Sequence, residues 1–325
     1  MGTPKVSVIV ITYNQEDSLP VALDSIVNQE CSFDVETIVG EDCSTDKTRL
    51  VLEEYASKYK GIIKPLFNKT NQGILRNFAS VVSEANGEYV AFCDGDDYWC
   101  DKQKLAKQVD ILDSNPDIGL VYTDVIMDSR ITGQKYYRGM ASPQQDQFTQ
   151  LLKGNIIVSS TVCMRSDLLR FVNFDNYIEQ GFLMEDYPMW LSLSLHTRFH
   201  YLKEATACYV IKRDVVVSEE VSNHAMRFDE NSTKIRLYFQ ESFADNTSLS
   251  KDDILDDHCA LGYKCGLNMN DREFALRYVS QMHNRTPYVK RLTMICKSHL
   301  LFGMYQMYRG LTGKKRSPLE MYFGM

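Results

Sequence analysis

The stretch Tyr89-Val-Ala-Phe-Cys-Asp94-Gly95-Asp96-Asp97-Tyr98-Trp99 joins an apolar run to an acidic triplet. The run from Tyr89 to Cys93 has the composition of a buried strand, and Gly95 marks its end. Three carboxylates crowded at one strand end repel one another unless a cation or ordered donors compensate. Such hard oxygen ligands suit Mg²⁺ or Mn²⁺, and waters and substrate phosphates fill the remaining coordination positions of these ions. The stretch therefore predicts either a metal–diphosphate site or a solvated acidic turn.

Strands and helices alternate regularly around this stretch. Val6 to Thr12 is β-branched and nearly all apolar, which is typical of a central strand buried on both faces. We expect further strands at 35–40, 62–67, 89–93 and 118–123, and helices at about 18–28, 47–59, 74–84 and 101–115. This alternation with short loops indicates an open, mostly parallel α/β sheet with right-handed crossovers.

Polar residues follow four of these strands. They are Thr12-Tyr13-Asn14, Glu41-Asp42, the segment 68–71, and Asp94 to Asp97. Parallel sheets bind ligands outside the carboxyl ends of their strands, so the four strand ends together predict one polar crevice. No G-x-G-x-x-G pattern follows the first strand, which disfavours a dinucleotide-binding fold.

The regular alternation fails after about residue 124. We expect a short helix at 148–153 and strands at 159–164, 200–202 and 205–211. Glu185-Asp186 precedes Tyr187-Pro188, and a helix is expected to begin at Asp186 or Tyr187 because proline is favoured in the first turn. Asp186 is then either the helix cap or a free carboxylate at the positive end of the helix.

From about residue 222 onward the sequence is helical, with helices expected at 225–243, 251–267, 271–283 and 288–309. The last is apolar on most of its circumference. Its basic residues, with those that follow it, are Lys290, Arg291, Lys297, Arg309 and Lys314-Lys315-Arg316. Such a helix can lie on an anionic membrane surface, or it can pack on the α/β domain or on a second subunit in a homodimer.

Composition restricts the class of protein. The chain has 325 residues, 44% hydrophobic and 24% charged, as in soluble globular proteins. A net charge of -7 argues against a general nucleic-acid binder. The nine cysteines lack any C-x-x-C pair and fit reduced thiols better than disulfides or zinc ligands. Because reduced thiols are typical of the cytosol, we expect a cytoplasmic protein, with peripheral contact with the inner face of the membrane as an open alternative. No apolar run is long enough to cross a bilayer.

Taken together, these pieces resemble the family 2 glycosyltransferases, which have the GT-A fold, a Rossmann-like open sheet flanked by helices. The matching residues are Val6 to Asn14, Glu41-Asp42-Cys-Ser44-Thr45-Asp46, Asn71-Gln-Gly73, Arg76-Asn77, Asp94-Gly-Asp96-Asp97-Tyr-Trp99, and Glu185-Asp186 with Trp190. The resemblance covers about the first 210 residues. It implies a glycosyltransferase domain over 1–220, with a nucleotide-binding half at 1–124 and an acceptor-binding half at 125–220, and a helical C-terminal region at 221–325.

The resemblance implies inverting transfer from a nucleoside-diphosphate sugar, with UDP expected, to a hydroxyl of a glycan or lipid-linked acceptor in bacterial surface polysaccharide synthesis. Asp42 would accept the base N–H, Asp94 would hold the ribose, and Asp96 would bind Mn²⁺ or Mg²⁺. Asp97 would be a second metal ligand or an orienting carboxylate. The other donor contacts implied are Thr12, Tyr13, Asn14, Glu16, Asn71, Gly73, Arg76, Gly95 and Lys212.

The catalytic base implied by the resemblance is Asp186, with Glu185 beside it as orienter or alternate. Two departures from the family pattern stand out. The acidic pair after the second strand is Glu41-Asp42, and Lys212-Arg213 occupies the position where the family often has an Arg or His near the diphosphate.

Two other readings of the same residues stay open. A non-catalytic nucleotide-sugar-binding protein would use the same crevice without turnover. A haloacid dehalogenase-like phosphohydrolase also carries D-x-D after a strand, but its motif continues with Thr or Val where this chain has Tyr98.

Overall fold

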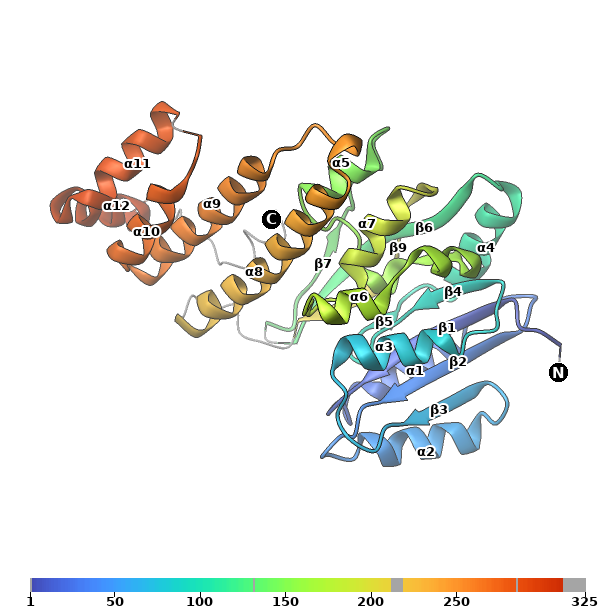
Figure 1. Ribbon diagram of the computed structural model, residues 1–325. Helices are drawn as coiled ribbons and strands as arrows, with labels where there is room; N and C mark the ends of the chain where they lie inside the picture. The colour runs from blue at the N-terminus through green and yellow to red at the C-terminus, as the bar shows by residue number, and fades with distance from the viewer. Residues whose placement is uncertain (1, 131, 212–218, 285, 312–325) are drawn as a thin grey trace. The chain divides into compact units, whose positions relative to one another are not determined.

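The structure is a computed structural model that describes residues 2–130, 132–211, 219–284 and 286–311 (Figure 1). The chain forms two compact units, residues 1–213 and 214–325. The domain division predicted at residue 220 falls just inside α8 (Glu219–Ser242), the first helix of the second unit.

A parallel half-sheet forms the first part of unit 1. Its strands are β1 (Val6–Thr12), β2 (Val35–Glu41), β3 (Ile63–Phe67) and β4 (Tyr89–Phe92), in the order β3-β2-β1-β4. The strand order reverses between β2 and β4, which lie on the two sides of β1. This is the switch point at which open parallel sheets bind ligands.

Helices cover both faces of this half-sheet (Figure 1). The apolar side chains of α1 (Leu19–Val27), α2 (Thr48–Lys58) and α4 (Lys104–Ser114) form one core cluster with Val6, Val8 and Val10 of β1. On the other face α3 (Ile74–Ser83) packs so closely that a Cβ at Gly40 would lie 2.4 Å from Val81. Because successive strand residues point to opposite faces, the apolar run of β1 supplies both cores.

Beyond β4 the sheet becomes mixed. β8 (Cys163–Arg165) lies antiparallel between β4 and β6 (Ile118–Ser129), and β9 (Arg198–Ile211) runs parallel to β6. The short β5 (Tyr98–Trp99) pairs antiparallel with β9, and β7 (Lys135–Arg138) pairs with β6. The open α/β sheet predicted from the sequence is confirmed, and the parallel strands β1 to β4 lie within the regularly alternating part of the chain.

Shorter elements complete unit 1. They are α5 (Gln147–Leu152), η1 (Ser159–Thr161), η2 (Ser166–Phe171), α6 (Phe174–Glu179) and α7 (Asp186–Ser194). The strand expected at 159–164 is wrong in its first half, which is the 3₁₀ turn η1, closed by the Thr161 N–H donating to the carbonyl of Val158. The two strands expected at 200–202 and 205–211 are one strand, β9, with register shifts against β6.

Unit 2 is helical. It contains α8, η3 (Ala244–Asn246), α9 (Lys251–Met269), α10 (Arg272–Gln281), α11 (Pro287–Lys297) and α12 (His299–Leu311). The single helix expected at 288–309 is wrong, because Ser298 is extended (φ -107°, ψ 122°). Its hydroxyl accepts from Leu301 N–H and its carbonyl from Phe302 N–H, so Ser298 ends one helix and begins the next.

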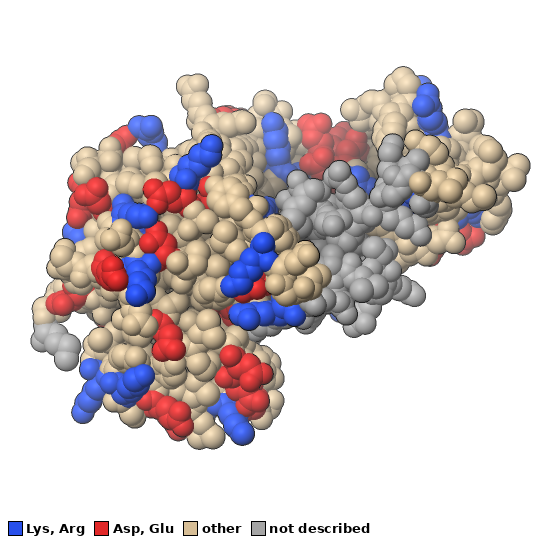
Figure 2. Space-filling view, turned by 180° about the vertical axis from the view of Figure 1, so that it is seen from behind, with Lys and Arg blue, Asp and Glu red and all other residues tan. Residues whose placement is uncertain are grey.

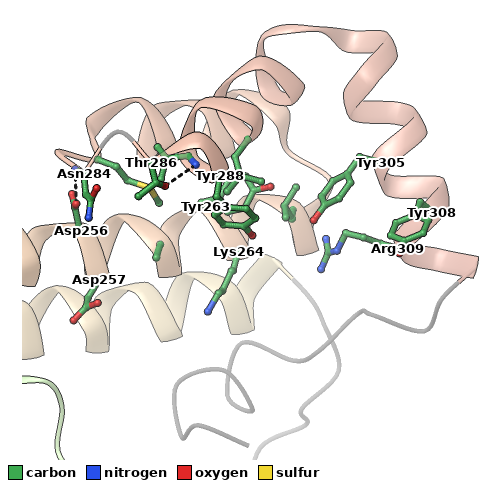
Figure 3. A pocket seen from close by; sticks show the side chains of 15 residues that line it. Asp256, Asp257, Tyr263, Lys264, Asn284, Thr286, Tyr288, Tyr305, Tyr308 and Arg309 are labelled. Carbon is green, nitrogen blue, oxygen red and sulfur yellow. Dashed lines mark hydrogen bonds between the residues drawn. The ribbon is translucent and has the colours of Figure 1, made fainter.

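A pocket of about 470 Å³ lies among α9, α11 and α12 (Figure 3). The rings of Tyr263, Tyr288 and Tyr305 stand around it, and the buried Tyr263 hydroxyl has no hydrogen-bond partner in the described part of the chain. Within the described residues, no helix is both long and apolar enough to cross a bilayer. On the face shown in Figure 2, acidic and basic side chains are interspersed.

Candidate active site

The parallel register brings three of the predicted polar strand ends to one edge of the sheet. Thr12 at the end of β1 is paired with Glu41 at the end of β2. Asp42 N–H donates to the carbonyl of Thr12 at 3.1 Å, and Gly95 N–H donates to the carbonyl of Ile11 at 3.0 Å. The loops after β1, β2 and β4 therefore start side by side, as the sequence predicted.

Gly95 allows the acidic turn to lie against the end of β1. A Cβ at this position would lie 2.4 Å from Oε1 of Gln15 and 2.9 Å from Oγ1 of Thr12. The Thr12 hydroxyl donates to that same Gln15 oxygen at 2.8 Å. Only glycine fits without displacing this hydrogen-bonded pair, so the turn after β4 is held close to the first loop.

Asp97 is the buried member of the acidic triplet. One carboxylate oxygen accepts from the backbone N–H of Val210 at 3.0 Å, and the other accepts from the hydroxyl of Ser160 at 2.9 Å. Burial, and then the charge of Asp96, raise the pKa of Asp97 to about 8. This carboxyl joins the acidic turn to β9 and η1, and it is mostly protonated at neutral pH in the absence of a cation.

Asp94 and Asp96 are half-buried on the same turn. The pKa of Asp94 is raised well above its usual range by burial and by the charges of Asp97, Asp96 and Asp186. Asp186 belongs to α7, so a carboxylate at the start of α7 is close enough to the acidic turn for the charges to interact. The sequence predicted both groups of carboxylates, but not their proximity.

Asp186 lies at the first residue of α7. It accepts from Tyr187 N–H at 2.6 Å and from Nδ2 of Asn155 at 3.2 Å. Burial raises the pKa of Asp186 to about 6, and these donors, with the nearby indole of Trp190, oppose the rise. The Trp190 indole N–H is buried and does not reach hydrogen-bonding geometry with any described group. At neutral pH Asp186 is therefore mostly ionised and able to accept a proton.

Two further residues belong to this acidic group. The pKa of Glu185 is raised well above its usual range by burial, then by Asp186 and Asp94. Tyr209 on β9 was missed in the sequence. Its pKa is raised by burial and by four carboxylates, those of Asp97, Asp96, Asp94 and Asp186. No local motif marks Tyr209, because only the pairing of β9 with β5 and β6 places it here.

Asp42 anchors the loop after β3. Its buried carboxylate accepts from the N–H groups of Gln72 and Gly73, at 2.8 and 2.9 Å, and from Nδ2 of Asn68 at 2.8 Å. The side chain of Asn71 donates to the Asp42 carbonyl at 3.1 Å. An ionised carboxylate has about four acceptor positions, and these donors occupy three of those of Asp42.

The first loop is tied to the loop after β2. Asn14, in the left-handed region with φ 51°, accepts from Thr45 N–H at 2.8 Å, and Glu16 accepts from Lys47 N–H at 2.8 Å. Tyr13 and Arg76 are exposed. Asn14 and Glu16 thus shape the loop, and Tyr13 and Arg76 present surfaces to solvent. Lys212 lies outside the described residues.

A cavity of about 500 Å³ opens beside the acidic turn. Its lining includes Asn14, Glu16, Asp17, Asp96, Tyr98 and Arg130. Asp42 is not among the lining residues, because its carboxylate faces the 68–73 loop. The structure therefore places Asp96 at a cavity next to the first loop, and Asp42 outside the lining of that cavity.

The carboxylates fit a hard divalent ion in their chemistry. No basic side chain in the described part of the chain forms an ion pair with Asp94, Asp97, Glu185 or Asp186 within 4.0 Å, although their mutual repulsion raises several of their pKa values. Within the described residues no group of three or more His, Cys, Asp or Glu side chains is arranged to enclose an ion. This donor set suits an ion that takes one or two protein carboxylates and the rest from phosphates.

The family described as glycosyl transferase family 2 matches residues 7–170, which include every strand end described above and the acidic turn. The chain belongs to glycosyl transferase family 2. The match ends before Glu185 and Asp186, so these two residues have no support from it.

Among curated relatives of this family 2 chain, an uncharacterized protein of Mycobacterium tuberculosis is 37% identical over 166 residues, which are 49% of this chain and 46% of the relative. The chain thus matches about half the length of that relative. The putative glycosyltransferase EpsE of Bacillus subtilis is 30% identical over 190 residues, which are 58% of this chain and 66% of EpsE. WfgD of Escherichia coli, a UDP-Glc:alpha-D-GlcNAc-diphosphoundecaprenol beta-1,3-glucosyltransferase, is 29% identical over 190 residues, which are 58% of this chain and 69% of WfgD.

Two solved structures share the fold of this family 2 chain. TarS 1-349 of S. aureus, in complex with UDP-GlcNAc, superposes with a TM-score of 0.58 at 22% identity, over 99% of this chain and 92% of that one. The mannosyltransferase PcManGT of Pyrobaculum calidifontis, in complex with GDP-Man and Mn2+, gives a TM-score of 0.51 at 15% identity, over 95% and 88% of the two chains. The predicted GT-A type of fold is confirmed.

Proposed function

We propose that this chain transfers a sugar from a nucleoside-diphosphate sugar to a hydroxyl group of an acceptor, with inversion at the anomeric carbon. The observation that carries the proposal is that the Asp94–Asp97 turn follows a parallel strand at the switch point of the sheet and lies close enough to Asp186 of α7 for the charge of Asp186 to raise the pKa of Asp94. Family membership and the fold shared with two nucleotide-sugar complexes support it.

The donor would lie along the strand ends. Asp42 would accept the N–H of the base, and the exposed ring of Tyr13 would offer an aromatic face beside it. Asp94 would hold the ribose. We favour UDP as the nucleotide because TarS binds UDP and UDP-GlcNAc and WfgD is named for UDP-Glc.

Asp96 would hold a divalent ion, Mn²⁺ or Mg²⁺, with Asp97 behind it as second ligand or orienting carboxyl. When bound, such an ion supplies Lewis-acid stabilisation of the charge that develops on the departing diphosphate. A complex of PcManGT with Mn2+ supports the choice of ion.

Asp186 would act as the base. With a pKa of about 6 it is ionised at neutral pH, and it would take the proton of the acceptor hydroxyl as that oxygen attacks the anomeric carbon. Asn155 and the Tyr187 N–H hold its carboxylate in place, and Glu185 lies beside it. One base and one displacement imply inversion, because attack comes from the face opposite the leaving group.

The acceptor is proposed from the relatives alone. The name of WfgD describes a sugar on diphosphoundecaprenol as acceptor. We therefore propose a glycan or lipid-linked acceptor of bacterial surface polysaccharide synthesis for this chain.

The function is tested by product release from a panel of UDP- and GDP-sugars with Mn²⁺ and candidate acceptors. We expect the nucleoside diphosphate to appear when an acceptor is added, with the new linkage inverted in its NMR coupling constant. Binding of a nucleotide sugar without release for any acceptor would favour a non-catalytic binding protein. Release of inorganic phosphate would favour a phosphohydrolase.

A further inference from the structure

Helix α12 exposes an apolar stripe to solvent. Leu300, Met304, Met307 and Leu311 are 73%, 59%, 70% and 86% exposed. Their spacing of four, three and four residues puts them on one face of the helix. The helix is docked by its other side, because Phe302 is buried in the core cluster that α9, α10 and α11 share. The stripe is therefore the outward face of a packed helix.

Charge is divided unevenly along the chain at this point. Residues 285–319 contain eight Lys and Arg and no Asp or Glu, so this segment has a formal charge of +8. The rest of the chain has a formal charge of −15, and the two together give the net charge of −7. Within the described part of this segment, Lys290, Arg291 and Lys297 on α11 are exposed. Lys290 and Lys297 flank the exposed Met294 at helical spacing, so one face of α11 is both basic and apolar.

We propose that the helical unit docks on the surface of an anionic phospholipid bilayer, with the α12 stripe entering the interface and Lys290, Arg291 and Lys297 of α11 facing lipid phosphates. Apolar side chains on one face and basic residues without acidic ones are the two features that interfacial helices combine. A second copy of this chain fits less well, since pairing two such units would bring the like charges of Lys290, Arg291 and Lys297 together. The proposal goes beyond the proposed transferase function and stands without it.

The binding is tested by co-sedimentation of the full chain with sucrose-loaded vesicles of phosphatidylcholine alone or with about one third phosphatidylglycerol. We expect at least tenfold stronger partitioning onto the anionic vesicles, weakened by added salt because exposed charges are screened. Equal partitioning onto both kinds of vesicle, or none onto either, would overturn the proposal.

Variants locate the surface. Met304→Glu with Met307→Glu should reduce anionic-vesicle binding at least tenfold, and Leu50→Glu, on a leucine of α2 that is 57% exposed, should leave it unchanged. Lys290→Gln with Lys297→Gln should reduce it about fivefold for each charge removed. Circular dichroism checks folding, and Leu300→Ser, a milder change in the stripe, replaces the double variant if that variant unfolds. Unchanged binding of the stripe variants, or a dimer in light scattering that only these variants dissociate, would contradict the proposal.

Discussion

The carboxylate of Asp97 accepts a hydrogen bond from the backbone N–H of Val210 at 3.0 Å, across 113 residues of sequence. Its other oxygen accepts from the hydroxyl of Ser160. One buried side chain therefore connects the acidic turn after β4, the turn η1 and the end of β9. Asp96 immediately precedes Asp97 on the turn, so we expect its position to depend on this connection.

Replacing Asp97 by alanine should destabilise the fold. The change leaves the buried Val210 N–H and Ser160 hydroxyl without their acceptor, and each such loss costs about 1–3 kcal/mol. We expect a loss of about 2–4 kcal/mol in urea unfolding with EDTA present. Asp17→Ala, which removes an exposed carboxylate lining the same cavity as Asp96, should change stability by less than about 0.5 kcal/mol. Equal, small effects of the two changes would show that the Asp97 contacts do not hold the turn.

The same residue should make stability depend on pH. The pKa of Asp97 is about 8 in the folded chain, whereas its ordinary value, which applies to the unfolded chain, is 3.8. Between about pH 4 and pH 8 the folded state therefore binds a proton on Asp97 that the unfolded state has lost. Stability should therefore fall as pH rises from about 4 to about 8. Asp97→Asn carries no titrating group and should flatten this part of the curve in urea unfolding without metal. A parallel curve for the variant would mean that Asp97 ionises normally.

Asp186→Asn should separate donor binding from turnover. The amide keeps the size of the side chain but cannot take a proton, so kcat should fall by about 10²–10⁴ while the Kd for the donor stays within about threefold. Calorimetry with the nucleotide sugar and a product-release assay measure the two effects. Turnover that is unchanged would make Asp186 a helix-terminal carboxylate with no part in proton transfer.

Gly95→Ala should damage the donor site through the backbone. The added Cβ would lie 2.4 Å from Oε1 of Gln15 and 2.9 Å from Oγ1 of Thr12, so the Gln15 side chain must give up its hydrogen bond with Thr12 or the acidic turn must shift away from β1. We expect about 1–3 kcal/mol of lost stability and weaker UDP binding. At Gly139 the nearest atoms to a new Cβ are 3.7 Å away, so Gly139→Ala is the matched control. Similar behaviour of the two variants would show that the loop yields without penalty.

The sequence predicted the elements that have a local signal. Three features could be predicted because neighbouring residues in the sequence define each of them. They are the β-branched run at Val6 to Thr12, the polar ends of the parallel strands and the acidic turn. Tyr209 and Ser160 were not found, since strand pairing and a long-range hydrogen bond place them at the site. The break at Ser298 was missed because serine is only weakly unfavourable within a helix, and packing decides there.

The central claim is that the acidic turn binds a cation that in turn binds the donor diphosphate. Titration calorimetry of UDP with and without Mn²⁺ tests it most directly on the chain and on Asp96→Ala, with Asp17→Ala as the control. We predict that Mn²⁺ tightens UDP binding at least tenfold in the unaltered chain and in Asp17→Ala, and that Asp96→Ala loses this gain while it keeps its folding stability. An Asp96→Ala variant whose UDP affinity still rises tenfold with Mn²⁺ would contradict the account.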